Sequence, residues 1–293
     1  MRSQSGRAGT VNCKNKRQRG ETMYYMAYFR DEIPEVFLAC SEDLLHWEDM
    51  YQGKAVFSLR GSEQIVRDPF LMRDQDNVWH IFYTNNWYSN TIGHCTSDDL
   101  QNFTKQEDIR LFGEAQSDVY NCWAPEIFWN EDEKNYCMIW STSFRFQNSE
   151  HEDSNRIWCA KSRDLYHFSA PELFFDPGYP VIDASVLKKG DTYYMAFKDE
   201  RLFNAPGSPY SALRTATSAS ACGTYENISS ILTEWRSEGP MLLYEKDEYY
   251  IFYDSFGTGK YGAIKSKDFT HWENISAKLT IPEGCRHMSI FKA

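Results

Sequence analysis

A short motif recurs along the chain and constrains its fold more than any other feature. The motif is Ser-x-Asp, an apolar residue, two variable positions and an aromatic residue, and its clear copies begin at Ser41, Ser97, Ser162 and Ser266. A degenerate copy begins at Ser218, so successive copies are 48 to 65 residues apart. Such periods are typical of solenoids, propellers and repeat arrays. Four copies cannot all reach one active site, so we interpret the motif as turn chemistry.

A second repeat lies between these copies and has the pattern of a β-hairpin. An apolar run is followed by a charged turn and an aromatic-rich run, as in residues 123–140, 181–197 and 238–253. Runs of this composition, separated by Asp, Asn, Gly and Lys, predict antiparallel strands. Four strands in each of five periods predict an all-β fold, a five-bladed β-propeller.

The two ends of the chain together supply one of the five blades. Two strand-like runs, residues 24–29 and 36–40, precede the first Ser-x-Asp copy, and one, residues 287–291, follows the last. A blade assembled from both termini would close the ring and hide open sheet edges. We therefore expect one propeller domain at residues 23–293. The basic, polar residues 1–22 are expected to be a disordered leader.

Charge and hydropathy exclude several kinds of partner. The net charge of −11 argues against nucleic acid, because phosphate binding needs a basic surface. No apolar run approaches the roughly 18 residues of a membrane span. The leader lacks the apolar core of a secretory signal, which predicts a cytoplasmic protein, or a periplasmic or secreted one if an export signal has been removed. We expect a monomer.

The eight cysteines have no arrangement that predicts a function. They contain no Cys-x-x-Cys pair and no His/Cys cluster with the spacing of a zinc site. We interpret them as mostly buried free thiols, which is typical of a reducing compartment.

Acidic residues recur where the first strand of each hairpin begins. They are Asp68, Glu126, Asp183 and Glu238, one for each of four consecutive units. The innermost strand of each propeller blade lines the central channel. We therefore expect these four carboxylates, at equivalent positions of the repeat, to face one axial cavity.

Five short motifs in this order resemble glycoside hydrolase family 43, whose members are five-bladed propellers acting mainly on arabinofuranosides and xylosides. The resemblance spans residues 23–293 and rests on Arg67-Asp-Pro69, Trp123-Ala-Pro-Glu126, Ile182-Asp-Ala-Ser185, Glu238-Gly-Pro240 and Arg286-His287. Two positions depart from the family pattern: Ala184 replaces a usual Pro, and Met288 stands where Gly is frequent. No segment matches the C-terminal β-sandwich of many xylan-active members.

The resemblance implies a role for three carboxylates. Asp68 would be the general base, Glu238 the general acid, and Asp183 the residue that tunes the pKa of the acid and orients it. Inverting hydrolysis needs a protonated and an ionised carboxyl on opposite faces of the sugar, about 6.5–9.5 Å apart. A third carboxylate raises the pKa of the acid by like-charge repulsion.

The resemblance also suggests channel and substrate contacts. His287 matches a channel histidine that lies near a bound water or a metal ion, often calcium, so Ca²⁺ held via water is possible although no cofactor is required. Trp123 and Arg286 are candidate substrate contacts, and Glu126 would bind sugar hydroxyls or satisfy backbone donors. Trp87 and Phe144 follow strands and are candidates for stacking on a sugar. Residues 143–155 and 201–211 are expected to form the pocket rim.

The function expected from these residues is removal of a terminal sugar, most simply α-L-arabinofuranose, from plant-type poly- or oligosaccharides. β-Xylosidase and galactofuranosidase activities are close alternatives. Related fructan-acting propellers place an Asn-Asp-Pro nucleophile one blade earlier, and nothing upstream of Asp68 matches it. A non-catalytic glycan-binding propeller remains the alternative outside enzymes.

Overall fold

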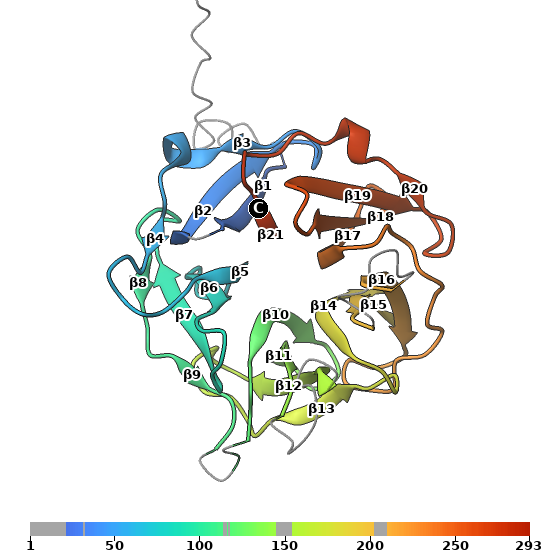
Figure 1. Ribbon diagram of the computed structural model, residues 1–293, viewed down its shortest axis with the longest axis horizontal. Helices are drawn as coiled ribbons and strands as arrows, with labels where there is room; N and C mark the ends of the chain where they lie inside the picture. Colours follow the sequence, from blue (N-terminus) through green and yellow to red (C-terminus); the bar gives the residue numbers. More distant parts are fainter. Residues whose placement is uncertain (1–21, 32, 114–115, 117, 145–153, 202–209) are drawn as a thin grey trace, which may run out of the picture.

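The protein forms a ring of five antiparallel sheets around a central axis (Figure 1). The computed structural model describes residues 22–31, 33–113, 116, 118–144, 154–201 and 210–293. Within this part of the chain the fold is nearly all β, which confirms the five-bladed β-propeller. No helix in the described ranges has the length and hydropathy of a transmembrane segment. The expected leader, apart from its last residue, lies outside the described residues.

Each blade is a meander that runs outward from the axis. The first complete blade contains β5 (Arg67–Arg73), β6 (Trp79–Thr84), β7 (Thr91–Ser97) and β8 (Thr104–Lys105), with β9 (Ile109–Arg110) also paired to β7. The second contains β10 (Trp123–Asn130), β11 (Asn135–Thr142), β12 (Arg156–Ser162) and β13 (Glu172–Phe175). The third contains β14 (Val181–Lys189), β15 (Thr192–Asp199) and β16 (Ala212–Ser218). The fourth contains β17 (Ser237–Glu245), β18 (Glu248–Ser255), β19 (Lys260–Ser266) and β20 (Glu273–Asn274).

Both ends of the chain build the fifth, closing blade, as the sequence predicts. Its order is β21 (Arg286–Lys292), β1 (Tyr24–Arg30), β2 (Ile33–Ser41) and β3 (Glu48–Asp49), with β4 (Phe57–Ser58) also paired to β2. Two short 3₁₀ turns, η1 (Met50–Gly53) and η3 (Ser276–Lys278), flank this region. The innermost strand β21 contacts β5 and β17, so the C-terminal strand closes the ring.

The Ser-x-Asp motifs are turns at the outer side of the blades. In each clear copy the Ser hydroxyl accepts a hydrogen bond from the amide of the Asp, at 3.2–3.3 Å. The Asp carboxylate then accepts two later amides at 2.8–2.9 Å. The apolar residue adopts a left-handed backbone, with φ of 62–73° at Leu44, Leu100, Leu165 and Phe269. These bonds explain why the motif repeats without belonging to a site.

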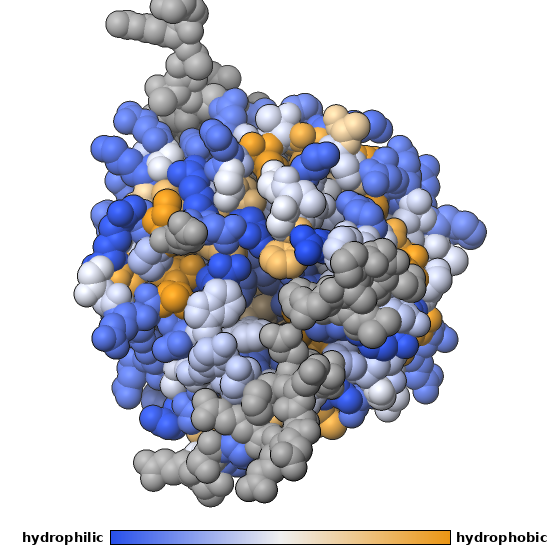
Figure 2. Space-filling model, in the orientation of Figure 1, coloured by the Kyte–Doolittle hydropathy of each residue, from blue (hydrophilic) through white to orange (hydrophobic). Residues whose placement is uncertain are grey.

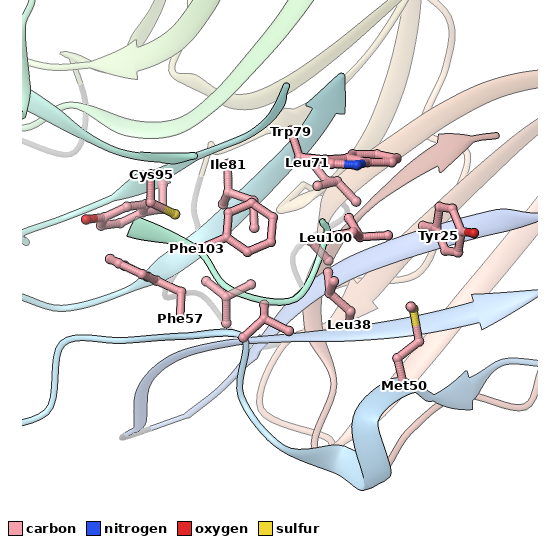
Figure 3. Packing of buried hydrophobic residues seen from close by; sticks show 14 of the residues in the cluster. Tyr25, Leu38, Met50, Phe57, Leu71, Trp79, Ile81, Cys95, Leu100 and Phe103 are labelled. Atoms are coloured by element: carbon pink, nitrogen blue, oxygen red, sulfur yellow. The ribbon is translucent and has the colours of Figure 1, made fainter. Parts of the chain in front are cut away.

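Large apolar side chains fill the spaces between neighbouring blades. Figure 3 shows one such cluster, in which Tyr25 and Leu38 of the closing blade pack against Trp79 and Ile81 of the first complete blade. The rings of Tyr25 and Trp79 meet edge to face, with centroids 5.9 Å apart. The aromatic residues of the second strands are therefore core residues. This packing holds the innermost strands around the axis.

Candidate active site

A bulge at the start of each innermost strand builds the centre of the propeller. The strand register shifts there in each blade, and the second residue of the bulge has a left-handed backbone with φ of 34–56°. These second residues are Asp68, Ala124, Asp183, Gly239 and His287. Bulges of this kind redirect side chains near active sites. Ala184 follows Asp183 without disturbing the bulge, although Pro follows Asp68.

The bulges correct one expectation from the sequence. Asp68 and Asp183 share the second bulge position, but Glu238 occupies the first position and Glu126 the fourth. The four acids therefore do not occupy equivalent positions of the repeat. The sequence spacing hid this difference, because a shift of one or two residues cannot be recognised until the bulge is known.

Asp68 is one partner of a half-buried ion pair. Its Oδ1 lies 3.1 Å from His287 Nδ1, and its Oδ2 accepts a 2.7 Å hydrogen bond from the Thr84 hydroxyl. Burial alone would raise the pKa of Asp68, but His287, Arg67 and Thr84 together lower it to about 2. Burial opposes the charge on His287, yet Asp68 and other carboxylates raise its pKa to about 9. At neutral pH Asp68 is ionised, as a general base must be.

Asp183 connects the third blade to the fourth. Its Oδ2 accepts a 3.0 Å hydrogen bond from the amide of Gly239, the residue after Glu238. Its own amide donates to the Ser141 hydroxyl of the second blade, also at 3.0 Å. Burial first, and then the charge of Glu238, raise the pKa of Asp183 to about 6. Asp183 therefore contacts the peptide that carries Glu238 and interacts with its charge.

Glu238 lies between two cations. Its Oε2 is 3.0 Å from Lys198 Nζ, and its Oε1 is 3.1 Å from an Arg286 nitrogen. The Lys198 side chain is only 1% exposed and also contacts Glu200 at 2.8 Å. Arg286 is held in turn by Asp254 and Asp31. These contacts hold the Glu238 carboxylate between Lys198 and Arg286.

Gly239 is the position where the site has least room. Its φ is +56°, and a Cβ atom there would lie 2.7 Å from Cγ of the His287 ring. Both the backbone conformation and the close approach of His287 therefore require glycine. The absent side chain lets His287 lie beside the fourth blade while it pairs with Asp68.

Glu126 acts as a bond between blades. Its Oε1 accepts a 2.7 Å hydrogen bond from the Val186 amide of the third blade. Two serines at the same bulge position bond the next blade in the same way, Ser185 to the amide of Leu242 at 3.0 Å and Ser289 to that of Leu71 at 2.9 Å. Burial raises the pKa of Glu126 to about 8. Of the two roles considered for Glu126, the structure favours the satisfaction of a backbone donor.

Aromatic residues lie at the mouth where the innermost strands begin. Trp123 donates a 2.9 Å hydrogen bond from its indole to the backbone oxygen of Trp87, and the two rings are perpendicular. Trp87 is 46% exposed, and the Arg67 guanidinium lies 4.8 Å from its ring centroid. A pocket of about 560 Å³ beside Arg67 and Trp87 extends along the closing blade to Phe29 and Asp31. In Figure 2, mostly hydrophilic and intermediate residues, coloured blue and white, surround the middle of the face in view.

Two other expectations concerned the rim. The structure does not bring Phe144 to this group, because its ring packs against Phe112 and Trp158 with centroids 5.7 and 5.4 Å away. Most of the rim segments 143–155 and 201–211, namely residues 145–153 and 202–209, lie outside the described residues. Of the three candidate aromatic residues, Trp87 and Trp123 lie together and Phe144 lies apart from them.

The channel side chains do not by themselves suit a calcium ion. Ca²⁺ takes 6–8 oxygen ligands, whereas Asp68 is paired with His287 and Glu126 with a backbone amide. In the described ranges, no group of three or more His, Asp or Glu residues brings its ligand atoms within 4.8 Å of one another. Calcium in the channel stays a prediction that would depend on bridging water.

Sequence reasoning missed Lys198, Asp31 and Asp254. Lys198 pairs with Ile182 in the sheet, at the strand position that holds Thr84 in the first complete blade. A lysine between the apolar strand residues 193–197 and two acids was a usable signal, because a buried cation requires carboxylate partners. Asp31 lies in a loop, and its place beside Arg67 and Arg286 depends on closure of the ring.

Comparisons with known proteins identify the family of the chain. Residues 21–292 match the family model described as "Probable glycosyl hydrolase domain", which is related to family 43. No match was found among curated proteins. A thermostable family-43 glycoside hydrolase is similar in structure, with 17% identity, a TM-score of 0.60 and coverage of 78% of this chain and 80% of that one.

Two further solved structures have different activities. An α-L-arabinofuranosidase from Lactobacillus brevis has 16% identity and a TM-score of 0.59, with 72% of each chain covered. An exo-β-1,3-galactanase from Clostridium thermocellum has 14% identity and a TM-score of 0.64, with 87% of this chain and 59% of that one covered. At these identities the likeness shows the propeller fold alone. The match over nearly the whole chain, residues 21–292, shows that the protein belongs to the family-43-related glycosyl hydrolases and is a glycosidase acting on carbohydrate.

Proposed function

We propose that the protein is an inverting glycosidase that releases a terminal α-L-arabinofuranose, with Asp68 as base, Glu238 as acid and Asp183 as modulator. The observation that carries the proposal is the linked set of three carboxylates at the channel. Asp68 is paired with His287, Asp183 bonds the Gly239 amide, and Glu238 contacts Lys198 and Arg286. These contacts give each carboxylate a distinct environment, which divided acid and base roles require.

The three environments support three roles. Asp68 is ionised, and each of its oxygens keeps a lone pair able to accept a proton from an attacking water. Glu238 would donate a proton to the leaving oxygen. Asp183 would act on Glu238 through its hydrogen bond to the Gly239 amide and through the repulsion between the two carboxylates. Binding of a sugar between Glu238 and Arg286 would break the ion pair that joins them.

We propose that the sugar binds at the aromatic residues Trp87 and Trp123 at the mouth of the channel. Trp87 offers an exposed ring, and Trp123 and Arg67 hold that ring in position. Aromatic faces stack on the C–H surface of a sugar ring, whereas Arg286 can donate to its hydroxyls. The arabinofuranosidase among the similar structures is consistent with a furanose, and the galactanase makes a β-galactoside the first competing substrate.

The test compares aryl α-L-arabinofuranoside, β-D-xylopyranoside, β-D-galactofuranoside and β-D-galactopyranoside as substrates. We expect the arabinofuranoside to be turned over and Asp68→Asn to lower kcat by about 10²–10⁴-fold with every leaving group. Glu238→Gln should cause a comparable loss with a poor leaving group and a much smaller one with dinitrophenol, which needs no proton. Glu172→Gln, an exposed acid on β13, is the matched control.

Further outcomes separate the parts of the proposal. Nuclear magnetic resonance of the first product should show the inverted anomer, and a retained anomer would contradict the mechanism. If only another glycoside is turned over, the proposed sugar would change, but the proposed roles of the three carboxylates would stand. Equal losses for Glu238→Gln with good and poor leaving groups would remove Glu238 as the acid. Glycan binding without turnover of any substrate would favour the non-catalytic propeller, and a chelator tests the calcium prediction.

A further inference from the structure

Three cysteine sulfurs meet at the junction of the second and third blades. The Sγ atoms of Cys137 on β11, Cys159 on β12 and Cys222 after β16 all lie within 4.8 Å of one another. Cys137 and Cys222 are separated by 3.8 Å. Cys137 and Cys159 are buried, whereas Cys222 is exposed. All three are free thiols, and the sequence, in which they are 22 and 63 residues apart, gave no sign of the cluster.

The backbone around the three sulfurs is well fixed. Cys159 pairs with Ile139, two residues from Cys137, so the two cysteines are diagonal neighbours on one face of the sheet. Cys222 lies in the degenerate fifth copy of the Ser-x-Asp motif, which has no Asp of its own. Asp132 of the second blade instead accepts a 2.9 Å hydrogen bond from the amide of Ala221. The two blades are thereby joined beside the sulfurs.

We propose that Cys137, Cys159 and Cys222 bind one thiophilic d¹⁰ metal ion such as Zn²⁺. Zinc binds thiolate sulfur at about 2.3 Å in tetrahedral geometry, which places the sulfurs of two ligands roughly 3.8 Å apart. The Cys137–Cys222 separation already has this value. A disulfide would instead need the two sulfurs to approach to about 2.05 Å. Water would complete the coordination on the exposed side.

The chemistry of the three side chains agrees with this assignment. The ion would displace the thiol protons as it binds. Soft thiolate ligands select Zn²⁺ and Cu⁺ over Mg²⁺ and Ca²⁺.

The metal would connect two blades away from the channel. Cys137 pairs with Phe128, five residues along β10 from Trp123. In the described part of the chain the third blade has three paired strands, whereas the other blades have four or five. An ion held by β11, β12 and the turn after β16 would strengthen this junction. The proposal is thus independent of the glycosidase assignment.

The experiment uses the untagged full chain, freed of metal with a chelator and titrated with Cd²⁺ and Zn²⁺. We expect a cadmium–thiolate charge-transfer band that saturates at one equivalent, and a rise in Tm of about 5 °C with saturating Zn²⁺. Cys222→Ser should weaken metal binding by at least about 100-fold, because it removes one of three protein ligands. Cys222→His should retain part of the affinity, and Cys285→Ala, outside the cluster, should bind as the parent does.

Several results would overturn the proposal. They are the absence of a charge-transfer band, a band of equal strength in Cys222→Ser, or binding of several ions without saturation. Mass spectrometry that finds only a Cys137–Cys222 disulfide in reduced and metal-supplemented preparations would also overturn it. Aryl glycoside turnover is measured in the same samples and should change less than twofold on metal removal. A failure of the glycosidase proposal therefore cannot be mistaken for a failure of the metal site.

Discussion

The Asp68–His287 ion pair should contribute measurably to the stability of the propeller. The two side chains are 13% and 19% exposed, and their charged atoms are 3.1 Å apart. The pKa of His287 rises from 6.5 to about 9 on folding, which corresponds to roughly 3 kcal/mol at 1.36 kcal/mol per tenfold change in proton affinity. The fall for Asp68 from 3.8 to about 2 gives roughly 2.5 kcal/mol. Both values describe largely one interaction, so we expect about 2–3 kcal/mol rather than their total.

The pH dependence of this contribution follows from the directions of the two pKa shifts. A raised pKa stabilises the fold fully below the unfolded value of His287, 6.5, and the contribution is lost as the pH rises through about 9. A lowered pKa stabilises above the unfolded value of Asp68, 3.8, and that contribution is lost as the pH falls through about 2. The pair should therefore contribute most between about pH 4 and pH 6.5 and little above about pH 9.5.

A double-mutant cycle with Asp68→Asn and His287→Gln isolates this energy. Free energies of urea unfolding for the parent, both single variants and the double variant give the coupling at pH 5.5, 7 and 9.5. We expect about 2–3 kcal/mol at pH 5.5 and less than about 1 kcal/mol at pH 9.5. Each single variant should be less stable than the double variant, because it leaves one charge buried and unpaired. A coupling below about 0.5 kcal/mol, or one that does not change with pH, would refute the reasoning.

Three further predictions concern the backbone around the channel and the outer turns. Gly239→Ala should lower kcat/KM at least about tenfold and destabilise the fold by about 1–3 kcal/mol, because its Cβ would meet His287; near-parent values would show that the ring can move. Glu126→Gln should change turnover less than about threefold, whereas Glu126→Ala should cost about 1–3 kcal/mol by orphaning the Val186 amide, and denaturant melts with aryl glycoside assays separate these outcomes. Asp43→Ala should cost about 1 kcal/mol at pH 7. This cost should fade as the pH falls through about 2, the lowered pKa of Asp43, because the parent carboxylate then becomes protonated and its hydrogen bonds weaken. A cost that is unchanged at low pH would contradict this.

The propeller was predictable because its signals repeat. The Ser-x-Asp turns and the hairpins between them recur five times, so the weakness of each local signal is offset by the period. The strand runs at the two ends made sense only as halves of one blade, and β21 pairs with β1 as that interpretation requires. The blades were predicted correctly because strand and turn chemistry act over a few residues.

The site was only partly predictable, because its contacts cross blade boundaries. The motifs bring Asp68, Asp183 and Glu238 to the channel, but no sequence pattern indicates that Asp183 bonds the Gly239 amide. Glu126 resembled a candidate ligand, and only its bond to Val186 shows its role between blades. The cysteine cluster was hidden for the same reason. Its members occupy unrelated positions in three sequence segments and meet through the packing of two blades.

The channel is asymmetric because the same backbone bulge carries different side chains from blade to blade. Each blade presents a left-handed residue at its bulge, and from Asp68 to His287 these residues alternate between polar and small. The two small ones, Ala124 and Gly239, leave room where a fivefold array of large side chains would collide at the axis. His287 uses the space at Gly239 and thereby reaches Asp68, while Asp183 uses the Gly239 amide. One missing side chain in the fourth blade therefore positions acids from the first and third, which is why a single methyl group there should disturb the whole site.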